Sequence, residues 1–384
     1  MPTSPSSATT PVPVRPETPR AGAPAPLRHS RGRGGRDRGA RGAAPQVTPR
    51  DADDRRRKNV LLSPFAVPHS PFAIHHSLPV MRRALLLAVA VGVASAAMGG
   101  PQTEARRPFD GRLAFRHLER QVQFGPRVPN TAGHRDCRDY LVETLRPLAQ
   151  RVERQDFTYP LGGDSLQMSN IVARWTGQRS LPGVLLCAHW DTRPTADYER
   201  DPARRRTPIP GANDGASGVA VLLEVARLLK SSPPTAPVMI VFFDGEDYGP
   251  GLDRMFLGAR YFADHLPADV PRRGVLLDMI GDKNLRIPQE ANSRAAAPTV
   301  MKEVYAIAAR LGYGSQFPAR TGPAIEDDHI PLHGKGLQVI DLIDFDYGPG
   351  HNWWHTLQDT PDKCSPNSLK AVGDVVLEWV RGRR

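Results

Sequence analysis

Four short stretches of the chain are apolar at almost every position until their ends: residues 183–189, 238–246, 274–281 and 337–344. A strand that is buried on both faces lacks the alternation of apolar and polar residues that marks a half-exposed strand. Each stretch has the length of a strand and is rich in Val, Ile, Leu or Phe. We therefore expect four strands inside a central sheet.

Helical periodicity separates these stretches. Between the first two, apolar residues recur at spacings of three and four: Val219, Leu222, Leu223, Ala226 and Leu229. Such spacing gives a helix one apolar face for the sheet, and further helices are expected at 258–265, 298–311 and 366–381. Alternating strands and helices predict an α/β fold, a three-layer sandwich with a central, mostly parallel mixed sheet flanked by helices.

The region before the first of these strands carries other patterns. Residues 109–152 have apolar positions at helical spacing on both sides of a turn-forming segment, FGPRVPNTAG, and predict two helices. Residues 155–175 alternate in polarity on both sides of LGGD, which predicts a β-hairpin. We interpret both parts as scaffold.

The net charge of +11 is concentrated near the N-terminus. Residues 1–80 hold 13 Lys/Arg against 5 Asp/Glu, and Arg82 and Arg83 follow, which leaves a net of +1 for all later residues. An Arg/Gly tract such as RGRGGRDRGARG can bind RNA. The expected folded part is nearly neutral, and the segment after the tract, residues 81–98, indicates that the tract is not part of the mature protein. We therefore expect no nucleic-acid partner.

The N-terminal composition predicts how the chain is divided. Residues 1–80 are rich in Pro, Arg, Gly and Ser without apolar periodicity, which predicts a disordered extension. Residues 81–98 begin with Met-Arg-Arg, continue as an apolar run and end in small residues, which is the order of parts in a secretory signal peptide. We expect translation to start at Met81, with 99–108 as a linker and 109–384 as one catalytic domain.

Residues 81–98 also decide the expected location of the protein. The apolar run is short for a membrane span, so we expect a cleaved signal, a mature chain with no membrane span, and a periplasmic or extracellular protein. An uncleaved N-terminal anchor with a cytoplasmic tail is the alternative.

The three cysteines, Cys137, Cys187 and Cys364, form no CxxC pair and no even disulfide framework. Cys187 lies within an expected strand and is most simply a buried apolar residue. Cys137 and Cys364 could pair in an oxidising compartment, and the sequence leaves that open.

Acidic and histidine side chains stand where three of the apolar stretches end. His189 ends the first stretch, Glu246 and Asp247 follow the second, and Asp278 lies in the third. The carboxyl ends of parallel strands share one edge of a sheet, so these side chains are expected to converge. Asp214 precedes the helix after the first strand, where it is suited either to a ligand role or to capping that helix.

The segment FFDGEDYG places three acids within four residues: Asp244, Glu246 and Asp247. Such acids repel one another unless a cation or a shared proton compensates; a solvated acidic turn is the alternative. Successive side chains in a turn point in different directions, so one can bind a metal while its neighbour acts as a base. We expect Asp244 to brace the turn.

The ligand types favour a catalytic zinc site. IEDDHIPL supplies Asp327, and GHNWWHT supplies Trp354 and His355. One His and two carboxylates that leave a fourth position open are typical of catalytic Zn²⁺, whereas structural sites usually use Cys.

These motifs carry a resemblance. HWD at 189–191, GANDGASG, FFDGED, LDMIGD, EDDHIPL and WWHT, in this order, resemble the zinc-dependent glutaminyl-peptide cyclotransferases, which share a fold with the M28-type zinc aminopeptidases. The resemblance runs from about residue 109 to the C-terminus. DDHIP followed by WHT is its narrower, cyclase-like part.

The resemblance implies a role for each residue. Asp214, Asp247 and His355 would bind one zinc ion, and Glu246 would be the general acid/base. Asp278 and Asp327 would form a proton network behind Glu246, and Trp354 would line the substrate pocket. His189 and Asp278 occupy the places that hold a second metal in the related aminopeptidases, so a second zinc is possible.

The implied reaction is the cyclisation of N-terminal glutamine, on peptides or proteins, to pyroglutamate with loss of ammonia. The sequence departs from the family at Asp247, where Glu is more usual, and the loop YGPGLDRMF lacks a Trp found in animal cyclases. FDYGPGHN likewise has glycines where those enzymes have an aromatic residue. The substrate preference is therefore less constrained than the metal site.

Two other functions compete with this one. A two-zinc aminopeptidase would use Glu246 to activate a water molecule against the first peptide bond. A catalytically silent binding domain would share the fold alone. DDHIP favours the cyclase, whereas His189 and Asp278 leave the aminopeptidase open.

Overall fold

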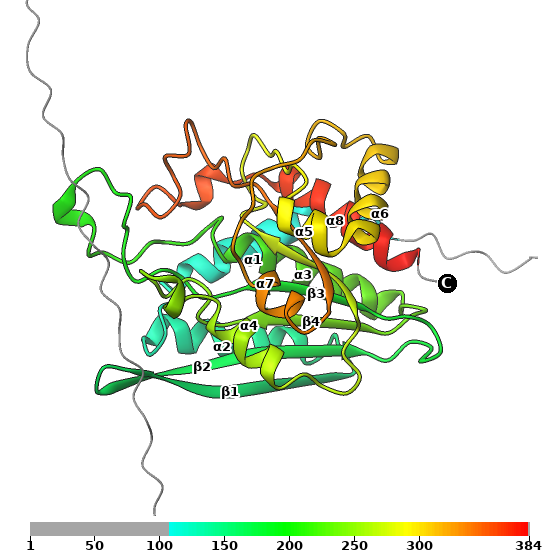
Figure 1. Ribbon diagram of the computed structural model, residues 1–384, viewed down its shortest axis with the longest axis horizontal. Helices are drawn as coiled ribbons and strands as arrows, with labels where there is room; N and C mark the ends of the chain where they lie inside the picture. The colour runs from blue at the N-terminus through cyan, green and yellow to red at the C-terminus, as the bar shows by residue number, and fades with distance from the viewer. Residues whose placement is uncertain (1–106, 383–384) are drawn as a thin grey trace, which may run out of the picture. The chain divides into compact units, whose positions relative to one another are not determined.

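A six-stranded mixed sheet forms the centre of the fold in the order β1-β2-β4-β3-β5-β6 (Figure 1). The computed structural model describes residues 107–382, all within one compact unit. The interpretations of residues 1–80 and 81–98, and of most of the linker, fall outside the described part. The strands are β1 (Arg151–Leu161), β2 (Asp164–Trp175), β3 (Val184–His189), β4 (Val238–Phe243), β5 (Arg273–Asp278) and β6 (Gln338–Ile343).

The sheet is antiparallel on one side and parallel on the other. β1 and β2 form the expected hairpin, and β2 pairs antiparallel with β4. The pairs β4–β3, β3–β5 and β5–β6 are parallel. The α/β prediction is confirmed, and so are the four buried strands.

Alternating side chains explain why these strands are apolar throughout. In β3, Leu186 and Ala188 pack into the larger hydrophobic core, while Leu185 and Cys187 pack into a second core on the other face. No side chain of β3 is more than 1% exposed. Because both faces of the strand are buried, its sequence does not alternate between apolar and polar residues.

Helices cover both faces of the sheet (Figure 1). The larger core receives side chains from α1 (Gly111–Gln123), α2 (Ala132–Leu145), α3 (Ala216–Ser231), α6 (Pro298–Arg310) and α8 (Pro366–Arg381). The second core receives them from α4 (Leu257–Asp264) and α7 (His329–His333). α5 (Ala291–Ala296) contacts β6, and three short 3₁₀ turns lie at Pro202–Arg204, Leu252–Arg254 and Pro361–Lys363.

The helices expected at 258–265, 298–311 and 366–381 are present as α4, α6 and α8, within one residue of those bounds. Residues 109–152 hold the two expected helices, but α2 ends at Leu145 and β1 begins at Arg151, inside that stretch. The helices α5 and α7 were not expected. The sequence EDDHIPL contains a proline, which argues against a helix in general. In α7 the proline is Pro331, in the first turn, where its missing N–H costs nothing. Short helices with a single turn carry too little periodicity to be predicted.

The three cysteines are free and buried. Cys187 is a core residue, as expected, and Cys137 and Cys364 form no disulfide. Among the described residues, none of the helices is both long and apolar enough to cross a membrane.

Candidate metal centre and active site

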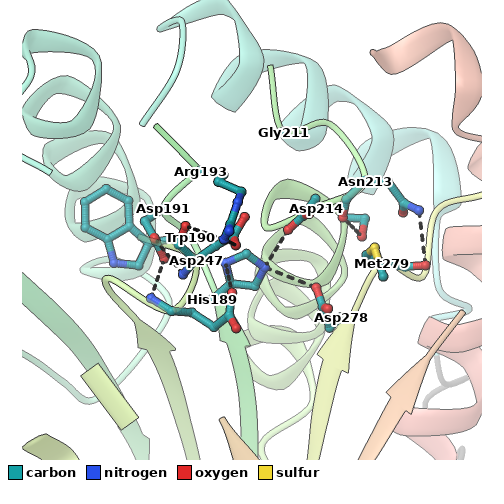
Figure 2. Close-up of polar contacts among 12 residues, drawn as sticks. His189, Trp190, Asp191, Arg193, Gly211, Asn213, Asp214, Asp247, Asp278 and Met279 are labelled. Carbon is teal, nitrogen blue, oxygen red and sulfur yellow. Dashed lines mark hydrogen bonds and ion pairs between the residues drawn. The ribbon is translucent and has the colours of Figure 1, made fainter. Parts of the chain in front are cut away.

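The order of the strands defines where a site is expected. From β3 the chain passes through α3 to β4 on one side, and then through α4 to β5 on the other side of β3. Such a reversal opens a crevice at the carboxyl ends of the strands. Figure 2 shows His189 at the end of β3 and Asp278 at the end of β5, with their side chains directed toward each other.

One group of three side chains has the geometry of a metal site. Asp214, Asp247 and His355 are buried, and each offers a ligand atom within 4.8 Å of the other two. The His355 Nε2 atom lies 3.2 Å from Asp247 Oδ1 and 3.6 Å from Asp214 Oδ2. Zinc bonds of about 2.0–2.2 Å at tetrahedral angles place ligand atoms about 3.3–3.6 Å apart. These residues therefore fit a zinc ion.

Two carboxylate oxygens in this group also indicate a metal site. Asp214 Oδ2 and Asp247 Oδ2 are buried and have no hydrogen-bond partner within the described residues. A buried carboxylate oxygen without a partner is costly unless a cation or proton compensates it. Asp214 is not the helix cap, since the N-cap of α3 is Gly215 and no side chain caps that helix.

A second group shares one residue with the first. His189 Nε2 lies 3.2 Å from Asp214 Oδ1 and 3.1 Å from Asp278 Oδ1 (Figure 2). These three residues also meet the geometric requirement for a metal ion. Asp214 thus faces His189 with one oxygen and His355 with the other, an arrangement suited to one or two metal ions.

Gly215 allows α3 to approach this site. It has a φ of +89°, and a Cβ atom there would lie 2.6 Å from the carbonyl oxygen of Asp191 and 3.0 Å from the His189 ring. A larger residue is excluded by both the conformation and the space. The glycines of GANDGASG therefore bring Asp214 close to the end of β3.

Glu246 lies beside the metal ligands and is 6% exposed. Its Oε2 atom is 3.6 Å from His189 Nδ1. Burial raises the pKa of Glu246 well above its ordinary value, the positive charge of a protonated His189 opposes this, and Asp247 adds to it. A carboxyl with a raised pKa can accept and return a proton near neutral pH.

Two buried groups hold Asp247 in place. Asp191 accepts the backbone N–H groups of Glu246 and Asp247 at 3.0 and 3.2 Å. Arg193 donates from Nη1 to Asp247 Oδ1 at 2.7 Å and from Nε to Asp197 Oδ2 at 2.6 Å. Burial raises the pKa of Asp247, but His355 and Arg193 lower it more, so that it stays below its ordinary value. Asp247 is therefore held ionised, as a ligand must be.

A Gly residue lets Arg193 lie this close to the acidic turn. Gly249 has a φ of +52°, and a Cβ atom there would lie 2.5 Å from Arg193 Nη1. The shorter Asp247 side chain reaches His355 at 3.2 Å in this setting. The departure from the usual Glu is thus accommodated by the local backbone.

Asp278 and Asp327 are both buried, and each has a further neighbour with which it interacts. Burial raises the pKa of Asp278, the contact with His189 opposes this, and the charge of Asp327 adds to it. Asp341 offers a carboxylate oxygen within 4.8 Å of one of Asp327. Burial raises the pKa of Asp341 well above its ordinary value, and the charge of Asp327 adds to this. The expected proton network therefore extends to Asp341.

This network ends in a buried histidine. Asp327, His329 and Asp341 offer ligand-type atoms within 4.8 Å of one another. His329 Nε2 lies 3.3 Å from Glu290 Oε2, and its Nδ1 lies 4.0 Å from Asp341 Oδ2. Glu290 also accepts the backbone N–H of Ile325 and of Ser293, at 2.9 and 2.5 Å. These contacts fix the segment that carries Asp327.

His355 and Trp354 come from a loop with a constrained backbone. His355 has a φ of +50°, a conformation that a non-glycine residue adopts at a cost. The Trp354 ring stacks on the His355 ring with a centroid separation of 3.8 Å. Trp354 is half-buried, so one part of its ring faces outward beside the candidate ligand.

The structure thus brings together every site residue expected from the sequence: His189, Asp214, Glu246, Asp247, Asp278, Asp327, Trp354 and His355. Asp244 braces the turn, since it accepts from His134 Nε2 at 2.9 Å and from the Ser169 N–H at 2.6 Å. The supporting residues Asp191, Arg193 and Asp341 were missed. Asp191, in the motif HWD, was the only one of them with a recognisable signal.

One more acid supports the Asp214 loop. Asp359 accepts the backbone N–H groups of Asn213 and Asp214 at 2.8 and 3.2 Å, and the Tyr347 hydroxyl donates to it at 2.8 Å. Burial raises the pKa of Asp359 to about 7. No sequence pattern connects residue 359 to residue 214.

The fold and these buried clusters define an M28-like zinc enzyme. A sequence model of peptidase family M28 matches residues 170–380. The match spans over half of the 384-residue chain, and the chain therefore belongs to this family.

Known proteins of two activities resemble the chain. Bacteroides thetaiotaomicron glutaminyl cyclase, in a crystal structure with N-acetylhistamine, has a TM-score of 0.68 and 37% identity, covering 72% of this chain and 99% of that one. Drosophila melanogaster glutaminyl-peptide cyclotransferase is 30% identical over 270 residues, 61% of this chain and 70% of that protein. Aminopeptidase YwaD of Bacillus subtilis is 29% identical over 204 residues, 51% of this chain and 40% of that protein, so less than half of that relative is spanned. Family membership alone does not choose between the two activities.

Proposed function

We propose that this protein is a glutaminyl-peptide cyclotransferase, which converts the N-terminal glutamine of peptides to pyroglutamate and releases ammonia. In this proposal Asp214, Asp247 and His355 hold one zinc ion. When bound, the zinc ion would supply Lewis-acid polarisation of the substrate's γ-carboxamide.

The observation that carries the proposal is the buried carboxyl network next to His189. Asp278 lies at the place of a possible second metal, where burial raises its pKa, the contact with His189 opposes this, and the charge of Asp327 adds to it. Asp278 already has a hydrogen-bond partner, because its Oδ1 lies 3.1 Å from His189 Nε2, whereas Asp214 Oδ2 and Asp247 Oδ2 have none among the described residues. This favours one metal ion at Asp214, Asp247 and His355, with Asp278 and Asp327 serving as proton-sharing groups.

Glu246 is the proposed general acid/base. The neutral α-amine of the substrate attacks its own γ-carbonyl carbon, and Glu246 takes the proton that the attacking nitrogen loses. Glu246 then gives this proton to the departing amide nitrogen, the C–N bond breaks, and ammonia leaves. Because nucleophile and electrophile belong to one residue, the main task of the site is to fold the glutamine side chain back onto its amine. We assign part of that task to Trp354.

An aminopeptidase is the second candidate, and one observation favours it. His189, Asp214 and Asp278 form a complete second group of possible ligands. With two metal ions, Glu246 would deprotonate a water molecule for attack on the first peptide bond. The two functions differ in the bond that breaks and in the product.

We also propose that the protein is exported and acts in the periplasm or outside the cell. The support is the sequence of residues 81–98. Sequencing the N-terminus of the protein purified from its native host tests this. A mature chain that contains residues before Met81 would contradict it.

Ammonia release from matched peptides tests the proposed reaction. A Gln-initiated peptide should release ammonia with the zinc-loaded protein, whereas the same peptide with N-terminal Asn should not, because its shorter side chain would have to form a strained four-membered ring. Release of a free N-terminal amino acid from either peptide would indicate an aminopeptidase. No product from either would favour a silent binding domain.

A further inference from the structure

An exposed aromatic residue lies beside the candidate metal ligand. Among the described residues, three large hydrophobic side chains are exposed: Tyr198, Leu252 and Leu311. Tyr198 is the most exposed of them, at 59%. Its ring lies 4.8 Å from the Trp354 ring and 6.0 Å from the His355 ring, measured between centroids.

Hydrogen bonds fix the backbone that carries Tyr198. The Tyr198 N–H donates to the carbonyl oxygen of His355 at 3.2 Å. The next residue, Glu199, is 7% exposed and accepts the N–H of Leu357 at 3.2 Å. Two successive residues of one loop are thus attached to the loop that carries His355, so the Tyr198 ring is held near Trp354.

A second set of contacts ties the same loop to the acidic turn. Asp197 accepts from Arg193 Nε at 2.6 Å and from the Thr195 hydroxyl at 2.6 Å. Arg193 in turn donates to Asp247 at 2.7 Å. The position of Tyr198 is therefore set by the residues that arrange the metal ligands. Its exposure is not that of a free loop tip.

The three rings form a series of increasing exposure. His355 is 3% exposed, Trp354 is half-buried, and Tyr198 is 59% exposed. The series leads from the candidate metal centre to the surface. One extended peptide residue spans about 3.3–3.6 Å, so two residues cover the 6.0 Å between the centroids of the His355 and Tyr198 rings. If the N-terminal residue of a peptide lies at the metal, its second residue can reach these two rings.

We propose that Tyr198 is a specificity-determining residue that, with Trp354, binds an aromatic or large apolar side chain at the second position of the substrate peptide. This inference rests on the function proposed above, because it requires the peptide N-terminus to lie at the metal. Tyr and Trp rings provide a large apolar contact area at low entropic cost, and aromatic pairs add a preference beyond burial alone.

The test compares Gln-Phe-amide with Gln-Gly-amide. The wild-type protein should have the higher kcat/KM for Gln-Phe-amide. Tyr198→Ala should lower kcat/KM for Gln-Phe-amide by about 3- to 10-fold, mainly through KM, while Gln-Gly-amide changes by less than about twofold. Tyr198→Phe should retain the preference, because it keeps the ring. Leu311→Ala, which removes another exposed side chain at the end of α6, should leave both values unchanged.

Equal losses on the two peptides in Tyr198→Ala, or an unchanged preference, would overturn the proposal. Mass spectrometry separates this outcome from failure of the proposed function, since free glutamine in place of ammonia marks peptide-bond cleavage. The ratio of kcat/KM for Gln-Phe-amide to that for Gln-Gly-amide is then measured from the release of free glutamine. The effect of Tyr198→Ala on this ratio tests the role of Tyr198 in the same way. If neither peptide is turned over, the proposed function fails. The role of Tyr198 is then tested by the Kd values of both amides: Tyr198→Ala should weaken the binding of Gln-Phe-amide but not that of Gln-Gly-amide.

Discussion

The Asp191 carboxylate accepts the backbone N–H of Glu246 at 3.0 Å, which ties the end of β3 to the turn after β4. Both residues are buried. The same carboxylate accepts the N–H of Asp247, so one side chain orients the proposed acid/base and its neighbouring ligand together. The Glu246 carboxyl contacts His189, whereas that of Asp247 contacts His355 and Arg193, so the two neighbours can perform different tasks.

Glu246→Gln should lower kcat by about 10²- to 10⁴-fold, because glutamine cannot carry the proton between the two nitrogens. The backbone bonds to Asp191 do not involve the Glu246 side chain, so zinc content and thermal stability should stay near wild type. Steady-state kinetics with zinc analysis and thermal unfolding checks both parts. Full activity of this variant would remove Glu246 from its assigned role.

His355→Ala should reduce the zinc content after dialysis, because it removes one of three proposed protein ligands. His351→Ala is the matched control, since His351 contacts the Trp354 ring from the same loop and belongs to neither ligand group. Elemental analysis of both variants gives the answer. Equal zinc in His355→Ala and wild type would exclude His355 as a ligand.

Arg193→Met should weaken zinc binding by about 10- to 100-fold, as the loss of outer-shell contacts typically does. Removing a positive charge near a cation acts in the opposite direction. However, Arg193 is already paired with the carboxylates of Asp247 and Asp197, so we expect the loss of orientation to dominate. Zinc affinity measured by chelator competition tests this, with exposed Arg200→Met as the control. Tighter binding in Arg193→Met would show that the charge effect dominates.

Asp344→Asn should make stability less dependent on pH. Burial raises the pKa of Asp344 from its ordinary 3.8 to about 7, although the N–H of Arg286 donates to it at 2.7 Å. An acid whose pKa is raised on folding stabilises the protein below its unfolded pKa, and this stabilisation is lost as the pH rises through about 7. The neutral side-chain amide in the variant does not titrate, so the variant loses no stability from this site in this pH range.

The stability of Asp344→Asn relative to wild type should therefore increase by roughly 1–3 kcal/mol between pH 5 and pH 8.5. Urea unfolding of both proteins at the two pH values measures this difference. Parallel pH profiles would show that Asp344 does not titrate in this range.

The sheet and the main candidate ligands could be predicted from the sequence because burial and strand order constrain those residues directly. A strand such as β3 must be apolar on both faces to be buried, and the acids after such strands must meet at one edge. His189, Asp214, Glu246 and Asp278 were therefore recognisable. Arg193, Asp341 and Asp359 were not, because their contacts join segments far apart in the sequence. Asp359 illustrates this, since it supports the backbone of Asp214 from 145 residues away.

The most direct test of the central claim is the reaction of a Gln-initiated peptide with the zinc-loaded protein in H₂¹⁸O, followed by mass spectrometry. Cyclisation uses no water, so the account predicts a peptide lighter by about 17 Da, intact in its backbone and without ¹⁸O. Free glutamine that carries one ¹⁸O atom would contradict it and would establish an aminopeptidase.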